Sequence, residues 1–388
     1  MRARQRRAVA AIALLAAVSA STARMVAVHS DQTAAAALLP GQGRFAGAVS
    51  LGPVAFKGEL LVWATGGFSS DEIKRIRDSP QVAAIAAVRT GLLAVESRRA
   101  GYPVVPVEAM AANRDAYAAA LGKPAGHLAG MLRKGAVLSA TGARLRGLRP
   151  GSQLRLHGGR RVAVTGVVAD WVIGGYEVAV DRELGRRLKL ERATYLLLRS
   201  RGPRPAFEAA IRRLVPGRAL RFRAPGERSF LRAGDGALPL GLVKLRFGEF
   251  GVRSLSRPEP DPRWVREHVV RAVLPVLGPV RCHRLIVPHL AAAMTEVKRL
   301  RLEQLVDVTD FHRRGGCFSP LPAHGGGAEL SRRSFGIALG LNVAANPTGG
   351  KATTDLRLVR VLARHGFTWG GRWLRPAGSY YEWVGSGA

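Results

Sequence analysis

The chain has 388 residues, 47% of them hydrophobic, which is long enough for two domains that each bury a core. Its 60 Lys and Arg residues outnumber 27 Asp and Glu residues, and the formal net charge is +33 at pH 7. The basic residues are spread along the chain with few aromatics between them, which argues against a dedicated nucleic-acid surface. A compositional bias combined with affinity for anionic envelope polymers or lipid headgroups explains the charge better.

The first 24 residues have the three parts of a secretory leader. Residues 1–7 carry four arginines, residues 8–18 are an unbroken apolar run, and residues 19–23 are small. A run this short predicts a signal peptide rather than a membrane span, which needs about 20 residues. An uncleaved membrane anchor and a buried globular helix remain as alternatives. With a leader or an anchor, the rest of the chain is expected outside the cytoplasm, secreted or anchored.

Residues 25–224 predict an α+β domain of short strands and short helices. The helix expected over 69–77 starts with Ser69 and Glu72 in capping-box spacing, and Pro80 follows its end. A second, amphipathic helix is expected over 205–214. Strands are predicted over residues 59–64, 82–88 and 92–95, and the alternation of Tyr176, Val178 and Val180 predicts another.

The clearest local motif in this region is a hairpin over residues 154–168. Leu154 and Leu156 alternate with polar residues, Gly158 and Gly159 form the turn, and period-two alternation resumes after it. The block at 138–168, LSATGARLRGLRPGSQLRLHGGRRVAVTGVV, resembles the extracytoplasmic domain of MacB/FtsX-type ABC permeases. That resemblance implies a domain that transmits force or recognises a partner. The chain departs from a permease because no further apolar span of 20 residues follows, and an unrelated α+β domain is the alternative.

Residues 225–239 are predicted to be a linker, and residues 240–388 a second α+β domain. The run at 242–254 is predicted to be a strand. Helices are expected over 264–273 and from Pro288 to about residue 300.

The only two cysteines are Cys282 and Cys317, both in the second domain. In a secreted chain an even pair predicts one disulfide. A metal site is the alternative, and it would need partners from the histidines near them in the sequence, whose spacing fits no zinc pattern. These histidines are His283, His289, His312 and His324.

The stretch from 331 to 383 contains three blocks in a fixed order: SRRSFGIALGLN, then NP, then GFTWGGRW followed by SYYEW. This frame resembles the zinc DD-peptidase family that includes VanY-type D-alanyl-D-alanine carboxypeptidases and L-alanyl-D-glutamate endolysins. The resemblance implies an antiparallel sheet with helices packed on one side. A chance match is the alternative. The frame residues are Ser331, Gly336, Ala338, Asn342, Asn346, Pro347, Gly366, Phe367, Trp369, Gly370, Gly371, Trp373, Glu382 and Trp383.

The residues that carry the chemistry of that family are replaced. Its three zinc-ligand positions hold Arg333, Gly340 and Tyr380, and its general-base position holds Ala377. Arginine has no lone pair for a metal, glycine and alanine have no donor, and tyrosine ligates only as a phenolate. Leu321 stands about where the family has an arginine that helps to hold the substrate's carboxylate. We therefore expect a scaffold without metal, cofactor or catalytic residues.

A pocket of this kind can still bind a cell-wall peptide terminus or another anionic group without cleaving it. Arg333 and Arg332 place positive charge near the family's zinc position, and aromatic side chains offer apolar walls with polar tips. The alternative is that Arg333 pairs with an internal acid such as Glu382. The candidate groove consists of Ser331, Arg333, Asn342, Tyr380, Tyr381, Glu382 and Trp383.

The sequence as a whole predicts a pseudo-peptidase of the cell envelope that binds or scaffolds at peptidoglycan or another anionic polymer. A membrane or an ABC-transporter-like protein is a possible partner. The alternative is an active peptidoglycan peptidase with displaced zinc ligands such as Asp310, His312 or His324. A nucleic-acid binder is suggested by charge alone, and the leader argues against it.

Overall fold

The computed structural model describes residues 58–122, 125–190, 193–227, 230–236, 238–320 and 330–385. The leader and its membrane-anchor alternative, Leu321 and His324 lie outside these ranges. Contacts divide the chain into two units, Met1–Gln42 and Gly43–Ala388, and all described residues belong to the second. Within the described ranges, no helix is both long enough and apolar enough to span a bilayer.

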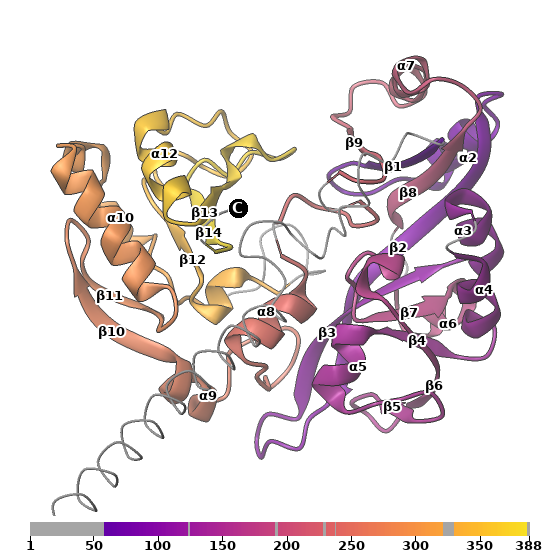
Figure 1. Cartoon of the computed structure of the whole chain (residues 1–388), viewed down its shortest axis with the longest axis horizontal. Helices are drawn as coiled ribbons and strands as arrows, with labels where there is room; N and C mark the ends of the chain where they lie inside the picture. The colour runs from indigo at the N-terminus through magenta and orange to yellow at the C-terminus, as the bar shows by residue number, and fades with distance from the viewer. Residues whose placement is uncertain are drawn as a thin grey trace, which may run out of the picture. The chain divides into compact units, whose positions relative to one another are not determined.

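The fold is mixed α+β, as the sequence predicts, and its largest element is a nine-stranded sheet with the order β5-β6-β4-β7-β3-β2-β8-β1-β9 (Figure 1). The pairs β3–β7 and β4–β6 are parallel, and the other neighbours in this sheet are antiparallel. The strands are β1 (Glu59–Trp63), β2 (Val82–Glu96), β3 (Val104–Ala112), β4 (Ala136–Ser139), β5 (Gln153–Arg155), β6 (Arg161–Val168), β7 (Val178–Asp181), β8 (Ala193–Ser200) and β9 (Arg221–Arg223).

Helices cover both faces of this sheet at its β1–β8 end. Leu60 and Val62 pack with residues of α2 (Ser70–Arg77) and α7 (Arg204–Leu214). Leu61 and Trp63 pack with residues of α3 (Arg114–Leu121) and α4 (Gly126–Leu132) on the other face. Successive side chains of a strand point to opposite faces, so a strand buried on both sides is hydrophobic throughout. The shorter helices α5 (Ala140–Arg146) and α6 (Arg182–Arg187) and the 3-10 helix η2 (Asp170–Ile173) complete this part.

Several local predictions for this region are confirmed. Helix α2 has the capping box between Ser69 and Glu72, and α7 begins one residue before the expected Pro205. The predicted hairpin is the antiparallel pair β5–β6, with both turn glycines at positive φ.

The two strands predicted at 82–88 and 92–95 are in fact the single strand β2. Residues 82–89 pair with β8, and residues 89–96 pair with β3. The polar and glycine residues at 89–91, which suggested a break, lie where the strand changes its pairing partner. The prediction was wrong because backbone pairing, which a single strand's pattern does not reveal, carries the strand across this point.

The run predicted as a strand at 242–254 begins instead in helix α8 (Leu240–Phe247). The helix buries Leu240, Val243, Lys244 and Phe247, which follow the three- and four-residue spacing of one helical face. A short apolar run is compatible with a strand or with a helix. In this protein the buried hydrogen-bond partners of Lys244 favour the helix.

Most of the described residues between 225 and 239 are buried or half-buried, and Gly226 is exposed. Arg223 donates to the carbonyl oxygens of Arg232 (2.6 Å) and Gly234 (2.6 Å). Leu231 and Leu238 are buried, and Asp235 accepts a bond from the backbone N–H of Leu374 at 2.6 Å.

After α8, the helix predicted over 264–273 is shorter than expected. It is α9 (Pro262–His268), and Val269 begins β10. The sequence VVRAVL at 269–274 is rich in β-branched residues and pairs with β11 (Gly278–His283), so pairing replaces the helix there. The helix predicted from Pro288 is confirmed as α10 (Val287–Arg299).

The last part of the chain contains a small antiparallel sheet in the order β12-β14-β13. Helix α12 packs on β13 and on α10, and the side chains of these elements share one hydrophobic core with α8 and β11. The elements are η3 (Glu303–Leu305), α11 (Val308–Arg313), η4 (Arg332–Phe335), β12 (Ala338–Gly340), α12 (Leu356–Arg364), β13 (Phe367–Trp369), η5 (Gly370–Arg372) and β14 (Tyr380–Trp383).

Candidate functional site

The three positions that resemble zinc-ligand positions come together around the start of the small sheet. Gly340 on β12 and Tyr380 on β14 are direct cross-strand partners. Arg333 lies in η4, the short helix just before β12, and its charge acts on Tyr380. The Ser331 hydroxyl caps that helix by accepting the backbone N–H of Arg333 at 3.2 Å. This hydrogen bond from the backbone to Ser331 therefore fixes where the helix η4 begins.

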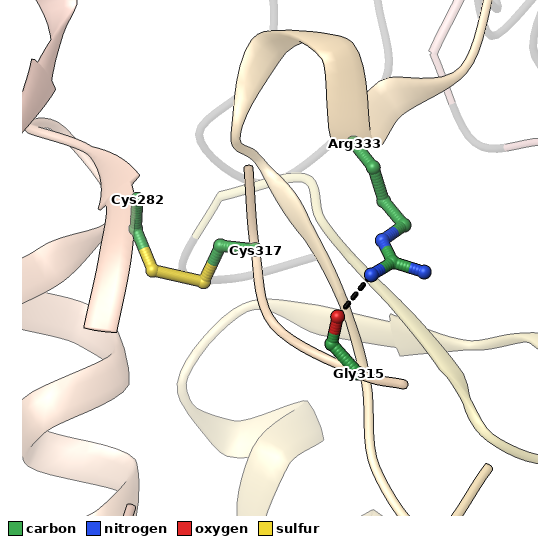
Figure 2. Close-up of a disulfide and its surroundings, with 4 residues drawn as sticks. All are labelled: Cys282, Gly315, Cys317 and Arg333. Carbon is green, nitrogen blue, oxygen red and sulfur yellow. Dashed lines mark hydrogen bonds between the residues drawn. A yellow bond between two sulfur atoms is a disulfide. The ribbon is translucent and has the colours of Figure 1, made fainter. Parts of the chain in front are cut away.

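Arg333 bonds to backbone rather than to an acid. Its Nη2 donates to the carbonyl oxygen of Gly315, as Figure 2 shows, and lies 3.5 Å from that of Arg314. Its Nε is buried without a hydrogen-bond partner, and burial lowers the pKa of this guanidinium. Arg333 forms no salt bridge with Glu382, or with any other carboxylate in the described ranges. The positive charge at this position is therefore not matched by a carboxylate of the described chain.

Gly315, the first residue of the run GGCFSPLP that also echoes the peptidase family, completes this arrangement. A Cβ at Gly315 would collide with the carbonyl oxygen of Gly340, so the close approach requires glycine. Gly316 forms an isolated bridge with Gly340. Cys317 follows and is joined to Cys282 by the predicted disulfide, with the two Cα atoms 5.0 Å apart (Figure 2). The sequence signal for this contact was the run GGCFSPLP, with its paired glycines before the cysteine.

Strand β14 divides the aromatic residues of the candidate groove between its two faces. Tyr380 and Glu382 lie on one face, where the Tyr380 hydroxyl donates to the Glu382 carboxylate at 3.2 Å. Burial, together with the neighbouring Glu382, raises the pKa of Tyr380 well above its usual value. Tyr380 therefore stays a neutral phenol that donates a hydrogen bond.

Tyr381 and Trp383 lie on the opposite face of β14, in the hydrophobic core. The Trp383 Nε1 donates to the His365 carbonyl oxygen at 3.2 Å, and the Arg246 guanidinium lies 4.4 Å from the Trp383 ring centre. The structure does not bring these two residues together with Arg333.

Arg332 and Asn342 have structural partners. Arg332 is buried and donates to the carbonyl oxygens of Leu330 (3.0 Å) and Leu238 (2.6 Å). The charge of Arg332 still acts on the face of β14 that carries Tyr380, because Arg332 and Arg333 both act to lower the pKa of Tyr380. Asn342 donates to the Leu305 carbonyl oxygen at 2.7 Å and accepts the Asp307 backbone N–H at 2.8 Å, so it fixes the segment before α11.

The other frame residues serve the backbone. The Trp369 Nε1 donates to the Gly378 carbonyl oxygen at 2.7 Å, and a Cβ at Gly371 would collide with the Trp369 ring. Ala377, at the family's general-base position, is buried and donates its backbone N–H to Gly370 at 2.9 Å.

The proposed displaced zinc ligands also have other partners. The Asp310 carboxylate accepts the backbone N–H groups of Val343 and, at 3.2 Å, of Ala344. The His312 Nε2 lies 2.9 Å from the Leu277 carbonyl oxygen. In the described part of the chain, no three His, Cys, Asp or Glu residues lie close enough together to hold a metal ion.

Comparison with known proteins finds the two resemblances again. A family model described as D-alanyl-D-alanine carboxypeptidase matches residues 324–377. No curated protein matches the chain. The solved structures that match include the periplasmic region of MacB from Actinobacillus actinomycetemcomitans, at 10% identity and a TM-score of 0.33. The match covers 45% of this chain and 94% of that one.

A second matching structure is the extracellular domain of the noncanonic ABC-type transporter YknZ from Gram-positive bacteria. It is 11% identical with a TM-score of 0.30, and the match covers 42% of this chain and 99% of that one. At these TM-scores the two likenesses carry no conclusion about function.

Proposed function

We propose that the chain is a non-catalytic cell-envelope protein whose peptidase-like region binds a cell-wall peptide terminus without cutting it. The observation that carries this proposal is the guanidinium of Arg333 at a position where the related enzymes hold a metal ligand. It is fixed there by the Gly315 carbonyl oxygen.

The residues at the three ligand positions do not fit a zinc ion. A guanidinium repels a dication and has no lone pair to share with it. Gly340 has no side chain, and the raised pKa of Tyr380 opposes the phenolate that metal binding would need. Because Ala377 has no carboxylate, a bound water would also lack its usual general base.

The same charges suit an anionic ligand. Arg332 and Arg333 both act on Tyr380, whereas Glu382 is the only carboxylate among the groups that shift the pKa of that residue. An arginine whose N–H donors are not all hydrogen-bonded within the protein binds a carboxylate or phosphate oxygen through charge-assisted hydrogen bonds. The C-terminal carboxylate of a peptidoglycan stem peptide is a ligand of this kind.

Binding of the full chain to purified peptidoglycan tests this proposal. We expect Arg333→Ala to weaken the binding by about tenfold, because one charge-assisted hydrogen bond to the ligand is lost. Arg313→Ala is the matched control, since Arg313 is exposed on the nearby helix α11. Equal binding by Arg333→Ala and the parent chain would rule out this pocket.

An active peptidoglycan peptidase is the second candidate, favoured by the match of residues 324–377 to D-alanyl-D-alanine carboxypeptidases. The two candidates differ in metal content. We expect the purified chain to contain much less than one zinc ion per molecule and to leave muropeptides intact. Stoichiometric zinc together with cleavage that a chelator abolishes would establish the enzyme instead, with the displaced ligands as its site.

The location follows from the same proposal. We infer an extracytoplasmic protein, secreted or anchored by its N-terminal segment, with residues 25–224 as a partner-recognising module and residues 240–388 as the peptidase-like module. An ABC-transporter-like protein is the partner class that the first module's resemblance suggests, and no nucleic-acid partner is proposed.

A further inference from the structure

The two-stranded hairpin β10–β11 has one face in the core and one face in solvent. Val270, Ala272 and Leu274 alternate with outward residues on β10, and they lie opposite Cys282, Val280 and Gly278 of β11. Cys282 and Val280 are buried, and the disulfide to Cys317 fixes the inner face. Figure 1 shows the hairpin as a ribbon beside α10. The outer face is thus held by covalent and apolar contacts behind it.

The outer face presents an arginine pair next to an apolar pair. Arg271 lies directly opposite Arg281, and Val273 lies directly opposite Pro279. All four residues are exposed, and Val273 is 81% exposed, the largest value among the exposed large hydrophobic side chains of the described residues. This places two positive charges and two apolar side chains on adjacent rungs of one ribbon.

This arrangement costs stability in the free protein. Like charges directly opposite each other on a sheet repel, and neither arginine forms a salt bridge within the described ranges. The Arg281 guanidinium instead lies over the Phe318 ring, 4.7 Å from its centre. The exposure of the apolar Val273 side chain to water is also unfavourable in free energy. Both costs are relieved by a single partner that is anionic at its surface and apolar beneath it.

We propose that the outer face of the β10–β11 hairpin docks on an anionic lipid surface. Arg271 and Arg281 pair with lipid phosphates, and Val273 and Pro279 enter the boundary between headgroups and acyl chains. A polyanionic wall polymer would use the arginines alone, because it offers no apolar layer to the valine. These four side chains are not among the residues of the candidate groove, and their test does not depend on the function proposed for the Arg333 pocket.

The structure contains a matched control for the charge. On the β5–β6 hairpin, Arg155 and Arg161 are also exposed and directly opposite each other. The next outward pair there is Gln153 and Ala163, without a large apolar side chain. The two hairpins thus share the arginine pair and differ in the apolar rung.

The test measures binding of the full chain to vesicles of phosphatidylcholine with and without phosphatidylglycerol. Each arginine near an anionic surface contributes about 1 kcal/mol, so Arg271→Gln/Arg281→Gln should weaken binding to the mixed vesicles by about 25-fold. Val273→Ser should weaken it while keeping both charges. Arg155→Gln/Arg161→Gln should change it by less than about twofold.

A local readout separates the hairpin from any other segment that touches the vesicle. A tryptophan in the Val273→Trp variant should be quenched by lipids brominated on their acyl chains, beyond the quenching of the parent chain. Equal losses in the two arginine-pair variants would show unspecific charge attraction and overturn the proposal. An unaffected Val273→Ser variant together with no added quenching in Val273→Trp would also overturn it, in favour of a polyanionic polymer.

Discussion

At the scale of single residues, Arg333 makes structural and electrostatic contacts at a position that resembles a zinc-ligand position. Its guanidinium takes a backbone carbonyl as its partner, and the neighbouring Tyr380 donates to Glu382 instead of losing its proton. Each group thereby has a hydrogen-bond acceptor within the chain.

A second residue whose chemistry depends on burial is His283. Its Nε2 lies 3.2 Å from the Phe247 carbonyl oxygen, and its Nδ1 accepts the Leu285 backbone N–H at 3.2 Å. Burial is the main cause that lowers the pKa of His283 to about 4. A proton on Nδ1 would break the bond from Leu285, so the folded protein requires the neutral ring.

We expect this histidine to make the fold sensitive to acid. The unfolded chain takes up the proton near pH 6.5 and the folded chain near pH 4, so stability falls as the pH drops between these values. The loss amounts to about 3 kcal/mol. Urea unfolding of the parent and of His283→Gln at pH 7, 5.5 and 4 should show this extra loss in the parent only. A parallel pH dependence in both proteins would contradict the assignment.

At the scale of elements, the disulfide joins the hairpin strand β11 to the segment that carries Gly315. Cys282 and Cys317 are 35 residues apart in sequence, and both are buried. The bond therefore supports two features at once: the inner face of the β10–β11 hairpin, and the carbonyl oxygen that holds Arg333.

Removal of this bond by Cys282→Ala/Cys317→Ala should lower the free energy of unfolding by about 4 kcal/mol. The reason is that the unfolded chain regains the freedom of a long loop. Chemical denaturation measures the loss, and dithiothreitol should produce a similar loss in the parent but none in the double variant. If reduction leaves the midpoint of the parent unchanged, the bond does not constrain the fold.

At the scale of the whole described chain, buried charges tie the nine-stranded sheet to α8. Glu177, after η2, pairs with Lys244 of α8 at 2.9 Å and with Arg146 of α5 at 2.8 Å. Burial opposes ionisation, but the two positive charges lower the pKa of Glu177 below its usual value. Glu108 on β3 pairs in the same way with Arg232 at 2.6 Å. The Glu177–Lys244 and Glu108–Arg232 pairs connect residues before 224 with residues after 225.

Glu177→Gln should therefore lower the free energy of unfolding by about 3 kcal/mol, because the buried Lys244 and Arg146 would then share one partly exposed carboxylate, that of Glu249. The matched control is Glu183→Gln, which removes an exposed pair with Arg187 and should cost less than about 1 kcal/mol. Denaturant unfolding of the two variants checks the difference. Similar small losses in both would show that the buried network is not coupled to the fold.

Local chemistry determined much of this protein from sequence alone. The capping box of α2, the β5–β6 turn glycines, the start of α10 and the cysteine pair depend on residues near one another or on composition, so they were predictable. The prediction that Arg333 and Gly340 do not ligate a metal also depends on residue type alone, because residue type decides whether a side chain has a lone pair for a metal.

Tertiary structure decided the rest. Helix α8 replaced a predicted strand because Lys244 finds buried partners far away in sequence, and β2 became one strand because two different neighbours pair with its halves. The candidate groove was divided because alternation along β14 sends Tyr381 and Trp383 into the core and leaves Tyr380 with Arg333. Pairing partners and the faces they cover are properties of segments distant in the chain, so a single stretch of sequence does not contain them.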